Sequence, residues 1–414
     1  MIALAVPRWL PFSVLGALMW GGWAVRQVLG ARYRPVHNEH REATSVVVPI
    51  YREDPLVLER CLRSWQGNNP EEIFLVLEQT EAGLISRARR WAEEDRSIRV
   101  LIVERASKRH ALTVGIRQAR HDIVLLTDSD TIWEEAFLPK MLMGFADPHV
   151  GGVGCRQNVY RPGTSLWRRV ADWMLDVRFL HYLPATARVG AAPCISGRTA
   201  AYRRSAILPL LDEMEFETFW GKQCISGDDG RLTWLILREG WKATYQMNAR
   251  AWTVFPSSLR GFVQQRVRWS RNSYRCYVQA VGKGWLWDQP VITSISVIQN
   301  LAGPFTLTLA TYFLVLESIH RDWLLVALAV SWLMLGRAVK SARHLVSEPE
   351  ALLFLPLVTL VFIVVMIPIK WYALFTLNRQ GWITRRPDGA VAEGQGGKTL
   401  GLALDLSNAG KVNG

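Results

Sequence analysis

The chain has 414 residues and a formal net charge of +13; half of its residues are apolar and 21% are charged. The mean hydropathy of +0.07 and the 19 tryptophans exclude a disordered chain and a disulfide-rich mini-protein. This length suffices for one large domain with membrane spans or for two medium soluble domains. The positive charge fits an anionic membrane surface or a phosphorylated substrate as well as it fits nucleic acid.

The N-terminal segment 9–25 carries no charge. Extended to Leu29, it is long enough to cross a bilayer core of about 30 Å as a helix. A cleaved signal peptide is the alternative, but the segment lacks a strongly basic start and an obvious small-residue cleavage site. Several arginines follow, and by the positive-inside rule they place the next domain in the cytoplasm. We therefore expect residues 1–41 to form a transmembrane helix and a linker.

Residues 42–257 have the pattern of a soluble domain in which short apolar strands alternate with helices. The expected strands are Ser45–Pro49, Glu72–Leu77, Ile98–Val103 and Asp122–Leu126, and the expected helices between them are Pro55–Gln66, Ala82–Glu94 and Arg109–Ala119. Continuous apolar strands separated by helices are typical of a buried parallel sheet. The pattern predicts an α/β domain whose ligand site lies at the carboxyl ends of the strands.

An acidic pair, Asp128 and Asp130, follows the fourth expected strand. Two carboxylates in one crevice repel each other unless a cation neutralises them. Hard divalent ions take oxygen ligands and often share them with substrate phosphates. A D-x-D pair alone is a weak signal, and a solvated turn that caps the next helix is the alternative. At the end of a strong strand, the pair predicts a site for Mg²⁺ or Mn²⁺.

Two cations, Lys108 and Arg109, stand at the start of an expected helix. Cations beside a helix N-terminus form an anion site, although a solvated basic turn has the same sequence. Close to a bound metal ion, this pair predicts a site that binds a diphosphate.

A second acidic pair, Asp228 and Asp229, lies in a loop before the expected helix Leu232–Leu237. Simple N-capping of that helix is one interpretation. A carboxylate held within hydrogen-bond reach of a hydroxyl can also serve as a general base. The segment 258–290 follows, rich in arginine and aromatic residues, and it is expected to contain interfacial helices.

The C-terminal region contains three uncharged segments, Val291–Leu316, Trp323–Gly336 and Ala351–Ile369. The first and last are long enough to span a bilayer, and the middle one could lie in the interface. Pro356 and Pro368 could interrupt the last segment. We expect membrane helices over 291–377, but the charges that follow leave the number of crossings open. Residues 378–414 are expected to be a cytoplasmic or disordered tail.

Two further patterns are weak. Gly396–Thr399 resembles the end of a P-loop, but Ala392 stands where the first glycine is required and no apolar strand precedes it. The five cysteines form no C-x-x-C pair, which predicts free thiols in a reducing compartment.

Six motifs occur in a recognisable order. They are VPIYRED (Val48–Asp54), SKRHAL (Ser107–Leu112), TDSD (Thr127–Asp130), SGRTAAYRR (Ser196–Arg204), GDDGRLT (Gly227–Thr233) and QQRVRW (Gln264–Trp269), and a W-x-T-R follows within Gly381–Arg385. The set resembles the processive family 2 glycosyltransferases, namely the hyaluronan, chitin and cellulose synthases. The resemblance covers roughly residues 43–386, and it implies a GT-A catalytic domain attached to transmembrane and interfacial helices.

The resemblance also implies roles for particular residues. For the donor, Tyr51, Glu53 and Glu78 would contact the uracil of a UDP-sugar, Lys108 would contact the diphosphate and Asp128 the nucleoside, while Asp130 would ligate Mg²⁺ or Mn²⁺. Asp229 would be the catalytic base, and the substrate site would also be lined by Ser196, Gly197 and Asp228. Three residues of one motif, Gln265, Arg268 and Trp269, would close on the acceptor and the diphosphate. The family usually has Asp at the position of Glu78.

The function implied by the resemblance is inverting transfer from a UDP-sugar to a growing polysaccharide, which would leave the cell through the attached spans. The catalytic domain would face the cytoplasm at the cell membrane, among membrane lipids, and nucleic acid is not expected as a partner. Fewer spans are visible than in hyaluronan synthases, so a homo-oligomer could complete the channel. A non-processive transferase acting on a lipid or short glycan is the second hypothesis. A catalytically silent membrane scaffold is the third, and the intact carboxylates argue against it.

Overall fold

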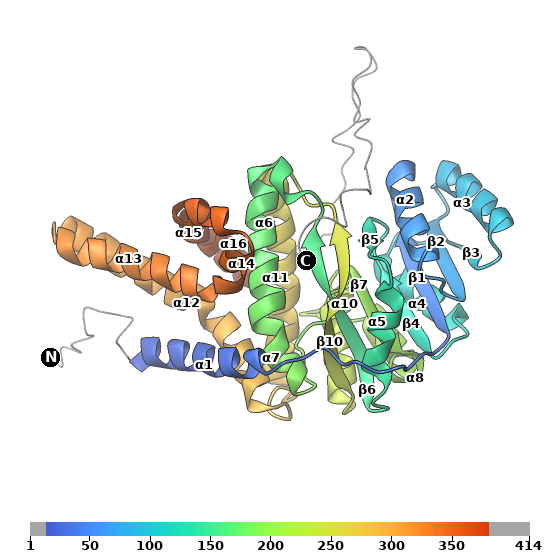
Figure 1. The fold of residues 1–414 in the computed structure, drawn as a ribbon, viewed down its shortest axis with the longest axis horizontal. Coiled ribbons are helices and arrows are strands. Elements are labelled where there is room, and N and C mark those ends of the chain that lie inside the picture. The colour runs from blue at the N-terminus through green and yellow to red at the C-terminus, as the bar shows by residue number, and fades with distance from the viewer. Residues whose placement is uncertain (1–13, 381–414) are drawn as a thin grey trace, which may run out of the picture. The chain divides into compact units, whose positions relative to one another are not determined.

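The computed structural model describes residues 14–380, which belong to one unit (Figure 1). Its centre is an eight-stranded sheet in the order β3-β2-β1-β4-β7-β6-β10-β5. The strands are β1 (Thr44–Ile50), β2 (Glu72–Glu78), β3 (Ile98–Val103), β4 (Ile123–Thr127), β5 (Thr131–Trp133), β6 (Val150–Val159), β7 (Thr199–Arg203) and β10 (Lys242–Thr253). The short strands β8 (Thr218–Phe219) and β9 (Lys222–Gln223) form a separate two-stranded sheet.

The first half of the sheet is parallel, as expected from the apolar runs. Strand β1 pairs in parallel with both β2 and β4, and β2 pairs in parallel with β3. The second half is mixed, because β7 is antiparallel to both β4 and β6, and β5 is antiparallel to β10. The strand–helix alternation did not predict this second half.

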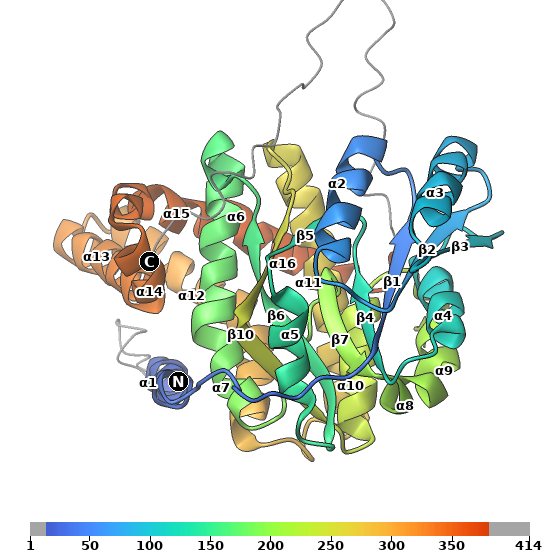
Figure 2. The same ribbon diagram turned by 45° about the vertical axis from the view of Figure 1, so that its right-hand side comes forward.

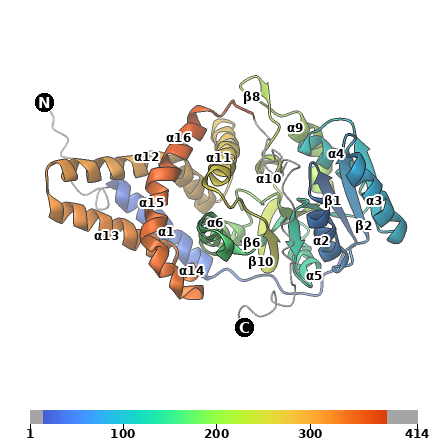
Figure 3. The ribbon, with the colours of Figure 1, turned by 90° about the horizontal axis from the view of Figure 1, so that it is seen from above.

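Helices cover both faces of the sheet, which separates two apolar layers (Figure 3). Residues on β1 alternate between the layers, with Val46 and Val48 on one side and Val47 on the other, as a strand with period two requires. Helices α2 (Pro55–Gln66), α3 (Ala82–Glu94) and α5 (Phe137–Leu142) pack on the first side, and α4 (Lys108–Gln118) and α10 (Asp228–Arg238) on the second. Burial on both faces explains why these strands are apolar without interruption.

Four further elements lie between the sheet and the apolar C-terminal region. They are α6 (Leu166–Asp176), a π-helical turn (Val177–Tyr182), α7 (Leu183–Arg188) and α11 (Leu259–Gly282). Helices α8 (Arg204–Ile207) and α9 (Leu211–Glu215) instead pack against α10. Figure 2 shows α6 beside β10 and β6, with the chain running from α1 (Val14–Ala31) across the front of the lower part of the sheet to β1. Both α6 and α11 contribute to the larger apolar layer.

Three segments of the described chain are long and apolar enough to cross a membrane: Val291–Ile319, Trp323–Lys340 and Pro349–Phe375. The first is α12 and the second is α13, which the sequence left open as an interfacial segment. The third is divided into α15 (Leu355–Val361), a π-helical turn (Phe362–Met366) and α16 (Ile367–Phe375), after α14 (Ala342–Ser347). Pro356 and Pro368 stand in the first turns of α15 and α16, where proline needs no amide donor.

Parts of the sequence predictions lie outside the described residues. These parts are the beginning of the first apolar segment before Val14, the W-x-T-R motif from Gly381 to Arg385, and the tail to Gly414.

The contact between α4 and the sheet generates a test of the packing. A Cβ added at Gly115 would overlap Cγ1 of Val47 and would lie 3.3 Å from a methyl of Val76. We expect Gly115→Ala to destabilise the protein by about 1–3 kcal/mol, because overpacking forces backbone or rotamer shifts. Thermal unfolding of the purified full chain in detergent measures the effect.

The matched control is Gly83→Ala in α3, where an added Cβ meets no atom within 4 Å. Alanine has the higher helix propensity, so this variant should keep or slightly raise the melting temperature. Equal melting temperatures for the two variants would contradict the packing described for α4.

Candidate active site

Lys108 joins two acidic loops that are far apart in the chain. Its Nζ lies 2.8 Å from Oδ1 of Asp128, just after β4, and 3.1 Å from Oδ2 of Asp228, at the start of α10. The charges of Asp128, Asp228 and Asp229 raise the pKa of Lys108 although burial opposes its charge. In the same contact, burial opposes ionisation of Asp228, but Lys108 outweighs it and lowers the pKa of that carboxyl.

Asp229 is held by backbone amides. Its Oδ2 accepts a hydrogen bond from the amide of Gly197 at 3.1 Å, and its Oδ1 accepts one from the amide of Gly230 at 2.8 Å. A Cβ at Gly197 would lie 3.0 Å from Cβ of Asp229, so only glycine leaves room for this approach. Gly227, with φ of +85°, turns the chain into α10 immediately before the acidic pair. These contacts fix the direction of the Asp229 carboxylate.

Arg109, expected to join Lys108 in gripping an anion, is directed elsewhere. It is buried, and its guanidinium donates to Oε2 of Glu217 at 2.7 Å and to the carbonyls of Met214 and Ser226 at 2.5 and 3.0 Å. It therefore anchors the loop before Asp228, and only Lys108 of the basic pair faces the acidic groups.

Helix α11 brings Gln265, Arg268 and Trp269 to the same place. Burial lowers the pKa of Arg268, while the charges of four aspartates, Asp128, Asp229, Asp228 and Asp130, favour its protonated form. Both acidic pairs therefore act on one guanidinium. Within the described part of the chain, the buried Nε of Arg268 and the buried Oε1 of Gln265 meet no hydrogen-bond partner. Such atoms can bind a polar ligand without breaking an existing bond.

Arg198 is a member of this site to which the sequence assigned no role. Its guanidinium lies 4.3 Å from the ring centre of Phe255 and 4.5 Å from that of Trp269. Burial lowers its pKa to about 10, and the charges of Asp128 and Asp130 oppose that change. Its position within the motif that begins at Ser196 could have indicated from the sequence that Arg198 belongs to the site. Arg266 lies over the Trp269 ring at 4.7 Å, so cations already contact this indole.

The three residues expected to contact a base lie at the ends of neighbouring strands. The buried carboxylate of Glu53 accepts a hydrogen bond at 2.5 Å from Oγ of Ser129, which stands between Asp128 and Asp130. Tyr51 is half-buried, with the Arg52 guanidinium 5.1 Å from its ring centre. Glu78 ends β2 and accepts a hydrogen bond from Thr80. The structure thus links Glu53 to the acidic pair, and it places Tyr51 and Glu78 after β1 and at the end of β2.

The donor set around Asp130 fits a hard divalent ion in its chemistry. Asp128 and Asp130 supply carboxylate oxygens at the end of β4, and Lys108 occupies one oxygen of Asp128. Because two side chains leave most positions of an octahedral ion unfilled, water or substrate phosphate oxygens would have to complete the shell.

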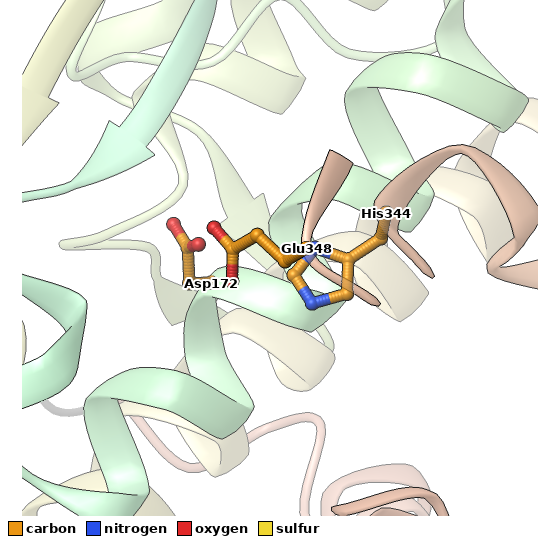
Figure 4. A group of neighbouring side chains, drawn as sticks. All are labelled: Asp172, His344 and Glu348. Carbon is orange, nitrogen blue, oxygen red and sulfur yellow. The ribbon is translucent and has the colours of Figure 1, made fainter. Parts of the chain in front are cut away.

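A separate group of metal-ligating residue types joins α6 to α14 (Figure 4). Ligand atoms of Asp172, His344 and Glu348 lie within 4.8 Å of one another, with the first two buried and Glu348 exposed. Nδ1 of His344 lies 2.9 Å from Oδ2 of Asp176, whose other oxygen accepts from Arg156 at 3.0 Å. The group contains none of the residues expected to bind a donor sugar, and we treat it as an ionic contact between the two helices.

Comparisons with known proteins agree with this geometry. The family description "Glycosyltransferase like family 2" matches residues 40–272, more than half of the chain. An N-acetylglucosaminyltransferase of Rhizobium leguminosarum bv. viciae is 30% identical over 359 residues, which cover 84% of this chain and 82% of the relative. One of Sinorhizobium fredii is 29% identical over 362 residues, covering 85% of this chain and 86% of the relative.

A solved mannosyltransferase from Pyrobaculum calidifontis, in complex with GDP-Man and Mn²⁺, has the same fold with a TM-score of 0.60. It is 22% identical and covers 84% of this chain and 96% of that one. The chain therefore belongs to the family 2 glycosyltransferases, with a GT-A fold built on a mixed sheet. The sequence expectation of a GT-A glycosyltransferase is confirmed.

The contact between α6 and α14 generates a prediction about pH. Burial, followed by the nearby charge of Asp176, raises the pKa of Asp172 to about 7. An unfolded aspartic acid titrates near pH 4. The folded state binds this proton more tightly, so its stabilising contribution is present below about pH 4 and is lost as the pH rises to about 7. The melting temperature of Asp172→Asn should therefore exceed that of the wild type at pH 8 by more than at pH 5.

Asp95→Asn is the control, because a hydrogen bond from the side chain of Gln66 lowers the pKa of Asp95 and neither Gln66 nor Ser97 titrates. Asp95 stays ionised from pH 5 to pH 8, so its substitution should change the melting temperature equally at both. A pH-independent effect of Asp172→Asn would refute the raised pKa of Asp172.

Proposed function

We propose that the protein is a membrane-bound, inverting N-acetylglucosaminyltransferase that transfers sugar from a UDP-sugar to the end of a growing glycan. The observation that carries this proposal is the convergence of both acidic pairs, Lys108 and Arg268 in one place. The names of the relatives in Rhizobium leguminosarum and Sinorhizobium fredii support N-acetylglucosamine as the sugar.

Asp229 is the proposed general base. Two backbone amides orient its carboxylate, and a carboxylate fixed in this way can take the proton of an acceptor hydroxyl as that hydroxyl attacks the anomeric carbon. One in-line displacement inverts the configuration, so a second carboxylate acting as nucleophile is not required.

Lys108 and Arg268 are the proposed stabilisers of the leaving diphosphate. Negative charge grows on the departing UDP as the sugar–phosphate bond breaks, and fixed cations favour that state over the ground state. The unpartnered Nε of Arg268 is a donor available for this charge. In the same proposal, Tyr51, Glu53 and Glu78 surround the uracil, and Gln265 and Trp269 contact the acceptor.

Asp130, together with the free oxygen of Asp128, is the proposed holder of Mg²⁺ or Mn²⁺. The bound ion would supply positive charge to the diphosphate. The solved mannosyltransferase from Pyrobaculum calidifontis was obtained with Mn²⁺, which supports manganese as the first ion to test.

The three apolar segments support a membrane location, and the arginines after the first apolar segment support a catalytic domain on the cytoplasmic side of the cell membrane. A glycan extended there would leave through the helices that adjoin the domain. The second candidate is non-processive transfer to a lipid or a short glycan. The small number of apolar segments favours it, because few helices are available to form a channel.

Product length separates the two candidates. The full chain, purified in detergent, is incubated with each of a panel of UDP-sugars and Mn²⁺, while UDP release and product mass are measured. UDP-N-acetylglucosamine should be consumed fastest, with long neutral chains as product. Products limited to a few sugars or attached to lipid would establish the second candidate, and no UDP release with any donor would refute both.

Substitution of Asp229 tests the proposed base. Asp229→Asn keeps the shape and the hydrogen-bond acceptor toward Gly197 but cannot take a proton, so kcat should fall by about 100-fold or more. Donor affinity should change little, and UDP release with titration of bound UDP measures both quantities. Asp212→Asn, at an exposed carboxylate paired with Arg117, should keep full activity. A kcat for Asp229→Asn within a few-fold of the wild type would exclude Asp229 as the base.

Substitution of Asp130 tests the proposed ion site. Asp130→Asn removes a charged oxygen ligand, so a higher Mn²⁺ concentration should be needed for half-maximal UDP release. The activity of the variant at saturating Mn²⁺ distinguishes weaker ion binding from misfolding. An unchanged Mn²⁺ dependence would place the ion elsewhere.

A further inference from the structure

A cavity of about 310 Å³ lies among α1, α12, α13 and the divided last segment. Figures 1 and 3 show α1, α12 and α13 side by side. Four cations line this cavity: Arg26, Arg337, Lys340 and Lys370. It shares no lining residue with the group of residues proposed to bind the donor. The cavity is therefore a separate feature of the membrane helices.

Among the described lining residues, Glu317 near the end of α12 is the one carboxylate. Within residues 14–380, no carboxylate lies within 4 Å of a nitrogen atom of any of the four cations. Because the four side chains line one cavity, their positive charges repel one another. Two of them contact aromatic rings: the guanidinium of Arg337 lies 3.4 Å from the ring centre of Phe362, and Nζ of Lys340 lies 4.6 Å from that of Trp20. Charge enclosed in a membrane protein is costly unless an opposite charge compensates it.

Arg26 shows most clearly that the cations lack a compensating negative charge. Its side chain is only 3% exposed, and within the described residues its Nε meets no hydrogen-bond partner. One terminal nitrogen reaches Oγ of Ser296 at a long 3.4 Å, and the guanidinium lies over the ring of Tyr182 at 4.3 Å. A buried guanidinium with a free donor is suited to an anionic acceptor.

The cavity is cationic at one end and mostly apolar at the other. Arg26 lies toward the end of α1, and Arg337 and Lys340 lie at the end of α13, so these cations are near the catalytic domain. Phe313 and Leu314, late in α12, and Leu325, early in α13, line the other end together with the carboxylate of Glu317. The lining thus changes along the helices from cationic to mostly apolar.

We propose that this cavity binds one anionic phospholipid, with the phosphate among the four cations and an acyl chain along the apolar end. The phosphate supplies the missing negative charge and several strong hydrogen-bond acceptors. A glycan of N-acetylglucosamine is neutral and cannot compensate four cations. Free phosphate would satisfy the cations but leave the apolar end empty.

Lipid binding by the full chain, without any sugar donor, tests this site independently of the proposed function. The purified protein, freed of lipid by washing in detergent, is titrated in mixed micelles with dioleoyl-phosphatidylglycerol, dioleoyl-phosphatidylcholine or inorganic phosphate. Phosphatidylglycerol should raise the melting temperature saturably, with one lipid retained per chain in native mass spectrometry. The zwitterionic lipid and inorganic phosphate should have little effect at equal concentration.

Three variants locate the site. The double variant Lys340→Gln with Lys370→Gln should raise the phosphatidylglycerol concentration at half-saturation about tenfold or more. Lys340→Glu supplies a carboxylate to the other cations, so the lipid-free variant should melt above the lipid-free wild type and gain less from the lipid. Arg321→Gln, at an exposed residue in the turn between α12 and α13, is the control and should respond like the wild type.

Three results would overturn the proposal. Equal responses to the two phospholipids would exclude recognition of the anionic headgroup. A response to inorganic phosphate as large as that to phosphatidylglycerol would exclude the acyl chain. An unchanged lipid response in both the double variant and Lys340→Glu would place the binding outside this cavity.

Discussion

The site depends on one half-buried cation that connects segments about a hundred residues apart. Lys108 contacts Asp128 at the end of β4 and Asp228 at the start of α10. Without its charge, the acidic groups that converge here would repel one another at the edge of the sheet. The fold and the charge pattern of the site are therefore coupled through a single side chain.

Local patterns were sufficient for the first half of the sheet and insufficient for the second. Strands β1, β2 and β4 are apolar because both faces are covered, and such runs are visible in the sequence. Strand β7 and strand β10 contain arginine, lysine or glutamine, and β10 has a register shift where it pairs with β6. The direction of pairing depends on which strands become neighbours after folding, and no local spacing encodes that.

The same limit applies to the site. The acidic pairs and Lys108 were predicted because each stands at a strand end or helix start, where backbone geometry fixes its direction. Arg198 received no role, since its partner Trp269 comes from a helix much later in the chain. The sequence predicted that Arg109 and Lys108 bind the same anion, because the two residues are adjacent. Lys108 faces the site, but Arg109 points away from it and binds Glu217. Contacts between elements far apart in the chain determine whether such an arginine side chain belongs to the site.

Helix α11 connects the proposed active site to the last apolar segment. Two arginines of α11 bind residues that follow the last apolar helix. Nε of Arg271 donates a hydrogen bond to Oγ1 of Thr376, and the guanidinium of Arg275 donates one at 2.6 Å to the side-chain oxygen of Gln380. Arg268 stands one turn earlier on the same helix. A tilt of the final helix would therefore be transmitted to the guanidinium that faces the aspartates. A change in the thickness of a surrounding bilayer that tilted this helix would then also shift the alignment of these charges.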